Sequence, residues 1–430
     1  MALLKIGDVV RAPLDGTLRA FYLDSPIPGT SLDRTTVEVS GWLIGARSQA
    51  REVQLWDEDI LLRTIPVNVP RPDVVAEHTD APERTGFWSL TGTLGLERNF
   101  KLDLRALFDD GTKAELGSIS GTRHPIASAE TRFSPVLLTS LGRTGTTLLM
   151  GLLSAHPTIV ADRTFPYETF PARYWLHLLQ VLAEPAKNGE SSAAETYALD
   201  LSHVGANPFH TAPLTNDPEV AELFGRSYVE RLARFCQESI DEFYGAVAAK
   251  QGKPTAELFV EKAHPDHVPR IARDLYPAAR EIFLVRDFRD LICSVLAFNE
   301  KRGTLEFGRA QFETDEEYVG WIGIGAGWLV NAWRARKTTS HLVRYEELAR
   351  RPAETLDGML GYLEVDRDPE LVDVLVRGAF EHPDFTDHRT SESIERSIGR
   401  WRRDLPPSLR PAVRRALAEA LSEFGYEADG

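Results

Sequence analysis

The stretch that decides the fold is SLGRTGTTLLMGLLSAHP, which spans Ser140–Pro157. The apolar run Pro135–Ser140 predicts a short buried strand, and the amphipathic run Thr146–Ala155 predicts a helix. Gly142 and Gly145 allow a tight turn that brings backbone N–H groups close to a ligand. At the start of the helix, unpaired N–H groups and the helix dipole favour an anion. The stretch therefore predicts a phosphate-binding turn between a strand and a helix.

The residues of this turn suit a phosphate but not a nucleoside triphosphatase. Arg143 offers a forked donor that can reach over the same anion. The Gly-Lys-Ser/Thr ending with which a triphosphatase holds Mg²⁺ and the γ-phosphate is missing. We therefore expect phosphate binding without ATP or GTP hydrolysis. A plain connection between strand and helix is the alternative for this motif taken alone.

A second stretch, FLVRDFRDLICS at Phe283–Ser294, predicts another phosphate contact. Arg286 comes at the carboxyl end of an apolar strand, where ligands of open α/β sheets bind. Ser294 follows eight residues later, about two helical turns, so both side chains can face one side of a crevice. An Arg with a hydroxyl suits a phosphate. Alternatively, Arg286 pairs with Asp287 or Asp290.

Apolar strands alternate with helices in the chain after residue 125. The predicted strand–helix pairs are Leu258–Glu261 with His267–Tyr276, Glu281–Arg286 with Phe288–Lys301, and His341–Arg344 with Glu347–Leu363. This alternation indicates a parallel sheet covered on both faces, a three-layer α/β domain. Trp321, Trp328 and Trp333 recur at helical spacing and predict a buried helix face.

The first part of the chain reads instead as short strands separated by turn residues. These strands are Thr36–Leu43, Val53–Trp56, Leu61–Val67, Gly86–Thr93 and Asn99–Phe108. They suggest a small all-β, sandwich-like domain. We therefore predict an accessory domain at residues 1–125 and the α/β domain at residues 126–430. The accessory domain is either a recognition or oligomerisation module or a packing appendage.

The composition limits the partners of this 430-residue chain. A net charge of −15 argues against broad binding to nucleic acid or anionic lipid, although a few local groups can still bind an anion. With neither a membrane-spanning run nor a signal-peptide core, we expect a cytoplasmic protein. Cys236 and Cys293 have no partners at metal-ligand spacing and predict buried free thiols. The excess of Arg over Lys suggests a bacterial source.

Together the two phosphate-binding stretches resemble the sulfotransferases that use 3′-phosphoadenosine-5′-phosphosulfate (PAPS). In that family the first loop holds the 5′-phosphosulfate, and an Arg…Ser pair eight residues apart holds the 3′-phosphate. Three further segments, Val260–Lys262, Leu342–Leu348 and Ser391–Leu405, resemble family segments in family order. The resemblance covers about residues 133–425 and is closest to the tyrosylprotein and carbohydrate branches. It implies a P-loop-like sulfotransferase domain that releases 3′,5′-ADP and requires no metal.

The resemblance also implies the site residues. The implied catalytic residues are Glu168 as the base, with Arg143 and Lys262 as electrophilic partners. The implied nucleotide-binding residues are Leu141, Gly142, Arg143, Thr144, Gly145, Thr146, Thr147, Arg286, Ser294, Ser393, Ser397 and Arg400. Glu168 is alternatively neutralised by Arg173, and Arg400 alternatively pairs with Asp404. If Glu168 is not the base, the candidates are His203, His210 and His264.

The acceptor is left open by the sequence. A carbohydrate hydroxyl, another natural-product hydroxyl and a tyrosine phenol all suit a carboxylate base. Three other functions are a P-loop kinase, a noncatalytic carbohydrate-binding protein with a decayed sulfotransferase domain, and a structural assembly protein. The oligomeric state cannot be predicted.

Overall fold

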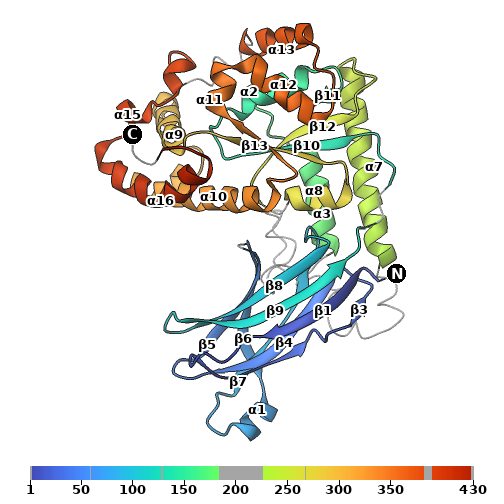
Figure 1. The fold of residues 1–430 in the computed structure, drawn as a ribbon, viewed down its shortest axis with the longest axis vertical. Helices are drawn as coiled ribbons and strands as arrows, with labels where there is room; N and C mark the ends of the chain where they lie inside the picture. The colour runs from blue at the N-terminus through green and yellow to red at the C-terminus, as the bar shows by residue number, and fades with distance from the viewer. Residues whose placement is uncertain are drawn as a thin grey trace. The chain divides into compact units, whose positions relative to one another are not determined.

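The computed structural model of the chain (Figure 1) describes residues 2–58, 60–126, 129–183, 226–266, 268–381 and 390–427. Two units account for these residues. One comprises Met1–Ala129 with Tyr174–Glu238, and the other comprises Glu130–Arg173 with Ser239–Gly430. That the chain consists of two domains with a boundary near residue 125 stays a prediction.

A five-stranded sheet, parallel throughout, forms the centre of the second unit. Its order is β11 (Ile159–Val160), β12 (Leu258–Ala263), β10 (Ser134–Thr139), β13 (Arg280–Val285) and β14 (His341–Arg344). The central strand β10 leads directly into the glycine turn and α2 (Thr146–Ala155). The turn therefore lies at the carboxyl edge of the sheet, where open α/β sheets bind ligands.

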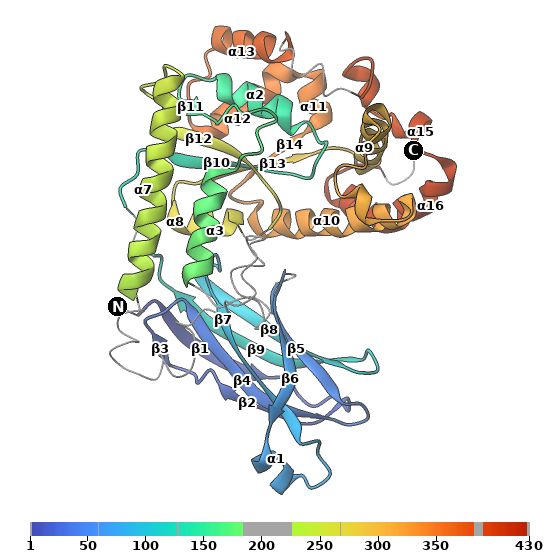
Figure 2. The same cartoon turned by 180° about the vertical axis from the view of Figure 1, so that it is seen from behind.

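Helices cover both faces of this sheet, as the alternation along β13 shows. Ile282 and Leu284 join the core beneath α2, α11 (Tyr345–Arg350), α12 (Pro352–Leu363) and α13 (Pro369–Glu381). Phe283 and Val285 join the core beneath α9 (Phe288–Arg302), α10 (Asp315–Arg336) and α16 (Arg410–Glu423). Figures 1 and 2 show α12 and α13 on one side of the sheet and α10 and α16 on the other. The predicted three-layer α/β architecture is confirmed.

The remaining helical segments are α1 (Pro72–Glu77), α3 (Pro171–Ala183), α7 (Arg226–Lys250), α8 (Val268–Leu275), η2 (Arg309–Gln311), η3 (Glu395–Ser397), α15 (Trp401–Asp404) and η4 (Pro407–Leu409). No helix in the described ranges is long and apolar enough to cross a membrane. Cys236 and Cys293 are buried free thiols, as predicted.

The first unit contains a nine-stranded antiparallel sheet. Its order is β2 (Leu18–Ser25), β4 (Thr36–Gly45), β7 (Arg84–Gly92), β6 (Ile60–Pro70), β5 (Ala50–Asp57), β8 (Asn99–Phe108), β9 (Lys113–Arg123), β1 (Leu4–Arg11) and β3 (Ser31–Leu32). Strand β6 pairs with β5 over residues 60–66 and with β7 over residues 67–70. Side chains from both halves of the sheet form one core, so the sheet folds over on itself like a sandwich.

One predicted helix, Glu347–Leu363, is two helices in the structure. Pro352 starts α12, and Arg351 before it has an extended φ of −137°. A residue before proline is disfavoured in the helical region because the proline ring clashes with its backbone. The chain therefore breaks between α11 and α12.

The prediction that the three tryptophans of α10 form a buried face is wrong for two of them. Trp321 and Trp328 are 39% and 59% exposed, whereas Trp333 packs against the core. The buried face of α10 instead carries Ile322 and Leu329. Helical spacing predicts which residues share a face but not which face meets the sheet.

Candidate active site

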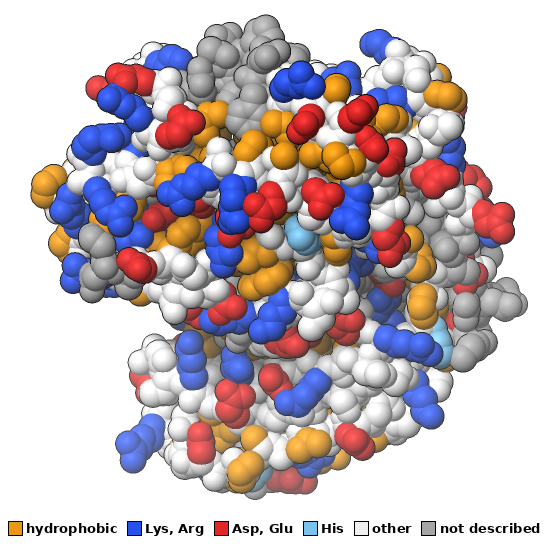
Figure 3. Space-filling model, turned by 45° about the horizontal axis from the view of Figure 1, so that its top comes forward, with side chains coloured by type: hydrophobic (Ala, Val, Ile, Leu, Met, Phe, Trp, Pro, Cys, Tyr) orange, Lys and Arg blue, Asp and Glu red, His pale blue; other side chains and the backbone are white. Residues whose placement is uncertain are grey.

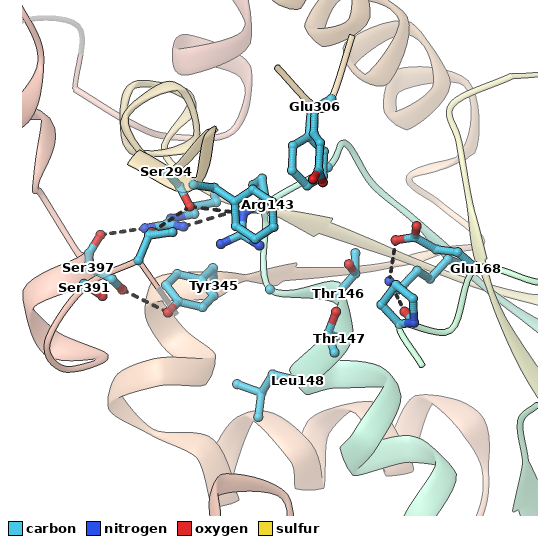
Figure 4. A pocket seen from close by; sticks show the side chains of 18 of the residues that line it. Arg143, Thr146, Thr147, Leu148, Glu168, Ser294, Glu306, Tyr345, Ser391 and Ser397 are labelled. Carbon is cyan, nitrogen blue, oxygen red and sulfur yellow. Dashed lines mark hydrogen bonds and ion pairs between the residues drawn. The ribbon is translucent and has the colours of Figure 1, made fainter. Parts of the chain in front are cut away.

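A cavity of about 640 Å³ opens at the carboxyl edge of the parallel sheet. It receives side chains from the glycine turn, the segment before α3, strand β12, helix α9, and the C-terminal segment around η3 (Figure 4). Of the sequence-predicted site residues, it brings together Gly142, Arg143, Gly145, Thr146, Thr147, Glu168, Lys262, Arg286, Ser294 and Ser397. Leu141, Thr144, Ser393 and Arg400 are not among the residues that line it.

The glycine turn can present backbone N–H groups to the cavity, because the side chain of Thr144 points into the protein and Gly145 has no side chain. Thr144 is buried, and its hydroxyl donates to the carbonyl of Leu141 at 2.9 Å. Gly145 has a φ of +99°, and a Cβ there would lie 2.6 Å from the ring of Tyr345. No side chain caps the N-terminus of α2. The first N–H groups of α2 therefore suit an anion in the cavity.

A cationic cluster with one unsatisfied donor lies beside the turn. Arg286 donates from Nη1 to the carbonyl of Arg143 at 3.2 Å and from Nη2 to the carbonyl of Ser397 at 2.7 Å. Its Nε is buried and has no partner among the described residues. Arg143 donates from Nε to Ser294 Oγ at 3.4 Å. Burial, and secondly the charge of Arg286, lower the pKa of Arg143 to about 10. A phosphate would satisfy the orphan donor and relieve this repulsion.

The alternative that Arg286 forms an ion pair with its neighbouring aspartates is wrong. Asp287 caps α9 and pairs with Arg289 at 2.8 Å. Asp290 accepts from the backbone N–H groups of Gly399 at 2.6 Å and Trp401 at 2.9 Å. Both carboxylates are used to hold other parts of the fold.

The C-terminal segment reaches the cavity through some of its predicted residues and not others. The hydroxyl of Ser397 lies 2.9 Å from that of Tyr345, against which Arg286 stacks at 4.6 Å from the ring centre. Ser393 accepts from the backbone of Arg396 instead. These contacts place Ser397, and not Ser393, next to the cationic cluster.

Arg400 is buried away from the cavity lining. Its Nε pairs with Asp404 at 2.8 Å, as the alternative for this residue proposed. Its Nη1 donates to Thr390 Oγ1 at 2.9 Å, and the Thr390 hydroxyl lies 3.3 Å from that of Ser294. In the structure Arg400 is linked to Ser294 through Thr390.

At the other end of the cavity, Lys262 and Glu168 form an ion pair. Lys262 Nζ donates to Glu168 Oε1 at 3.0 Å and to the carbonyl of Pro166 at 2.6 Å. Burial lowers the pKa of Lys262, and the charge of Glu168 opposes this shift. An ammonium has three N–H donors, so one is left for a ligand. Arg173 does not neutralise Glu168, because it pairs with Asp266 at 2.7 Å.

Of the three histidines considered as alternative bases, only His264 lies in the described residues, and it does not line the cavity. His264 is exposed, with its ring 6.1 Å from that of Phe170. His203 and His210 lie outside the described residues.

Sequence reasoning missed several residues of the lining. Phe298 and Arg302 follow Ser294 at intervals of four along α9, so helical spacing could have revealed them. The guanidinium groups of Arg143 and Arg302 each stack on Phe298, at 4.6 and 4.7 Å from its ring centre. Tyr345 follows a parallel strand, the position that indicated Arg286.

Two other residues, Glu306 and Phe307, were not indicated by any pattern and line the cavity from the irregular segment after α9. Ser391 lies in the predicted segment Ser391–Leu405 but was not named as a site residue, and it lines the cavity from the segment before η3. Only the folded chain brings these segments to the sheet edge.

Comparison with known proteins gives one family match. Residues 135–369 match the model of the sulfotransferase family. No curated protein matches the chain.

Solved structures that resemble this chain include sulfotransferases. A sulfotransferase domain from the curacin biosynthetic pathway is 17% identical, with 70% of this chain and 99% of that chain covered and a TM-score of 0.38. Sulfotransferase STF9 from Mycobacterium avium is 17% identical, with coverages of 70% and 79% and a TM-score of 0.35. A mouse sulfotransferase complexed with PAP is 10% identical, with coverages of 67% and 85% and a TM-score of 0.36. At these identities and scores, the structures add nothing to the family match.

Proposed function

This chain belongs to the sulfotransferase family, and we propose that it transfers a sulfuryl group from PAPS to an acceptor hydroxyl, releasing 3′,5′-ADP. The observation that carries the proposal is the arrangement within one cavity. Arg286, with its unsatisfied buried Nε, lies beside the uncapped start of α2, and the Lys262–Glu168 pair lies at the other end. Two anion-binding groups and a carboxylate are what such a transfer needs.

The donor subsite consists of residues that suit its two charged ends. The N–H groups of α2 and the hydroxyls of Thr146 and Thr147 suit the 5′-phosphosulfate. Arg286 and Ser294 suit the 3′-phosphate, because a forked cation and a hydroxyl both donate to phosphate oxygens. The orphan Nε of Arg286 supports this assignment.

The chemistry falls to three side chains of the cavity lining, Glu168, Lys262 and Arg143. Glu168 takes the proton of the acceptor hydroxyl while the hydroxyl oxygen bonds to sulfur and the bond between sulfur and the bridging oxygen breaks. Lys262 and Arg143 stabilise the negative charge that develops on the sulfonate and the bridging oxygen. The electron pair of the broken bond stays on the phosphate of the released 3′,5′-ADP.

Isothermal calorimetry with 3′,5′-ADP tests the donor site. We expect binding without a metal, and Arg286→Ala should weaken it by about 1.5–3 kcal/mol because a charged hydrogen-bonding group is lost. Arg367→Ala, which removes an exposed arginine paired with Asp357, should leave the affinity unchanged. Absence of 3′,5′-ADP binding, or tighter binding of ATP with Mg²⁺, would contradict the proposal and favour a kinase.

The same proposal includes the acceptor, which is a carbohydrate hydroxyl, another natural-product hydroxyl or a tyrosine. A cytoplasmic location and a bacterial source also stay proposals, since they rest on composition alone. The contact between Glu168 and Lys262 favours an enzyme over a noncatalytic carbohydrate-binding protein, which would need neither group.

A further inference from the structure

The cavity has few positive charges for a site that binds a polyanion. Its lining contains four cations, Arg143, Lys262, Arg286 and Arg302, and two carboxylates, Glu168 and Glu306. Among the described residues, the lining therefore carries a net charge of two positive units. Lys262 is already paired with Glu168, so its charge is partly neutralised.

The second carboxylate, Glu306, is not compensated by a cation in the described part of the chain. Thr304 Oγ1 donates to Glu306 Oε1 at 3.2 Å. The backbone of Glu306 is held by the Asn299 side chain, whose Oδ1 accepts from its N–H at 2.9 Å. The described residues offer Glu306 no ion pair, so no neighbouring cation pairs with this carboxylate of the cavity lining.

Of the two carboxylates, Glu168 lies away from the hydroxyl and aromatic groups of the donor subsite. In Figure 4, Ser294, Ser397 and Tyr345 lie together at one side, whereas Glu168 lies at the opposite side beyond Thr146. Glu306 lies between these two sides. An acceptor that approaches Glu168 therefore meets one carboxylate there and has Glu306 between it and the donor subsite.

The donor makes this part of the cavity more negative. A phosphate monoester carries about 1.5 to 2 negative charges at pH 7, and the phosphosulfate adds one charge on phosphorus and one on sulfur. The bound donor therefore brings about four negative charges, more than the lining neutralises. An anionic acceptor would meet repulsion from both Glu306 and the donor.

We propose that the acceptor is a neutral or cationic hydroxyl compound, and that Glu306 selects against acceptors that carry carboxylate or sulfate groups. This inference rests on the proposed function and narrows its acceptor class. It disfavours acidic tyrosine peptides and acidic glycans, and it favours neutral or amino sugars and uncharged or basic phenols.

Two matched sets of acceptors test the proposal with the full-length protein and PAPS. The phenols are 4-ethylphenol, tyramine and 3-(4-hydroxyphenyl)propionate, and the sugars are glucose, glucosamine and glucuronate. In the set that reacts, kcat/KM for the neutral and cationic members should exceed that for the anionic member by roughly fivefold or more. An anionic member that reacts as well as its neutral counterpart overturns the proposal but not the transfer activity. Reaction of none of the six overturns it too, and calorimetry with 3′,5′-ADP then decides whether the donor site survives.

The variant Glu306→Gln tests the residue that we hold responsible. The neutral-to-anionic ratio of kcat/KM should fall by roughly three- to tenfold, because one repelling charge is removed. Glu370→Gln, an exposed glutamate on α13, is the matched control and should leave the ratio unchanged. Affinity for 3′,5′-ADP shows whether the Glu306 variant is folded. An unchanged ratio in a folded variant contradicts the role of Glu306.

Discussion

At the scale of single residues, backbone strain gathers around the cavity. Six non-glycine residues of the described ranges have φ in the left-handed region. Among these six, Arg143 and Phe307 line the cavity, and Tyr167 and Phe170 flank Glu168. Such conformations cost on the order of 1 kcal/mol each and persist where the surrounding structure holds them. The strain supports a functional role for the segments that carry Arg143 and Glu168.

The role of Glu168 leads to the first prediction at this scale. Glu168→Gln should lower turnover roughly 10²- to 10⁴-fold, because the amide cannot accept the acceptor proton. Affinity for 3′,5′-ADP should be retained, since Glu168 lies at the far end of the cavity from Arg286. Steady-state kinetics with labelled PAPS and calorimetry measure the two effects. If turnover survives, the base lies elsewhere, and His264, His203 and His210 become the residues to substitute.

At the scale of elements, the junction of β10 and α2 carries the backbone geometry on which the proposed phosphate binding depends. Gly145 is both the left-handed N-cap of α2 and the neighbour of the Tyr345 ring. Gly151 lies six residues further along the same helix, and a Cβ there would meet nothing within 4 Å. A side chain is therefore excluded at Gly145 but can be accommodated at Gly151.

This contrast predicts opposite effects of the same substitution. Gly145→Ala should abolish measurable 3′,5′-ADP binding, because the new methyl group collides with Tyr345 and the φ of +99° is unfavourable. Gly151→Ala should preserve binding and raise the free energy of unfolding by about 0.5–1 kcal/mol, since alanine favours a helix over glycine. Calorimetry and urea denaturation measure these effects. Equal behaviour of the two variants would show that the turn does not approach the nucleotide.

At the scale of the whole molecule, one buried carboxylate joins three elements behind the active site. Glu261 on β12 accepts from the Ala172 N–H at the start of α3 at 2.7 Å and from the hydroxyl of Tyr244 on α7. Burial raises the pKa of Glu261 to about 7. Lys262, the next residue of the strand, faces the cavity. The position of α3, and with it the segment that carries Glu168, depends on this carboxylate.

The pKa of Glu261 predicts how stability changes with pH. A carboxyl whose pKa is higher in the folded state binds its proton more tightly there, so its contribution to stability is lost as pH rises from about 4.5 to 7. The loss is roughly 3–4 kcal/mol when the shift is complete. Between pH 5 and 8, the natural protein should therefore lose stability relative to Glu261→Gln in urea denaturation. Glu257→Gln, an exposed glutamate before the same strand, should follow the natural protein. Parallel pH profiles for the natural protein and Glu261→Gln would refute the shift.

The surface shows how the net charge of −15 is distributed. Figure 3 shows Lys and Arg side chains interspersed with Asp and Glu on the visible face. We therefore expect the proposed anion binding to depend on the cations inside the cavity, since this face carries no broad field of one sign.

The sequence by itself determined the features that depend on neighbouring residues. The predicted helix Thr146–Ala155 agrees with α2 at both ends, because glycine and hydrophobic periodicity act locally. The prediction that Arg286 and Ser294, eight residues apart, face one crevice agrees with the structure, where both line the cavity. Helix geometry is constant, so such a spacing can be interpreted from sequence. Strands β1, β2, β3 and β9 were missed. Strand β1 is largely exposed and β9 contains Gly117 and Gly121, both of which weaken the sequence pattern of a strand.

Only the tertiary structure decided which distant segments meet. Tyr345 and Ser397 are 52 residues apart, yet their hydroxyls lie within hydrogen-bond distance beside Arg286. The sequence left two partners open for Arg400, the nucleotide and Asp404. In the structure Arg400 contacts Asp404 and Thr390. Such choices depend on the packing of whole elements against one another, and no periodicity within a single element records which of its faces another will cover.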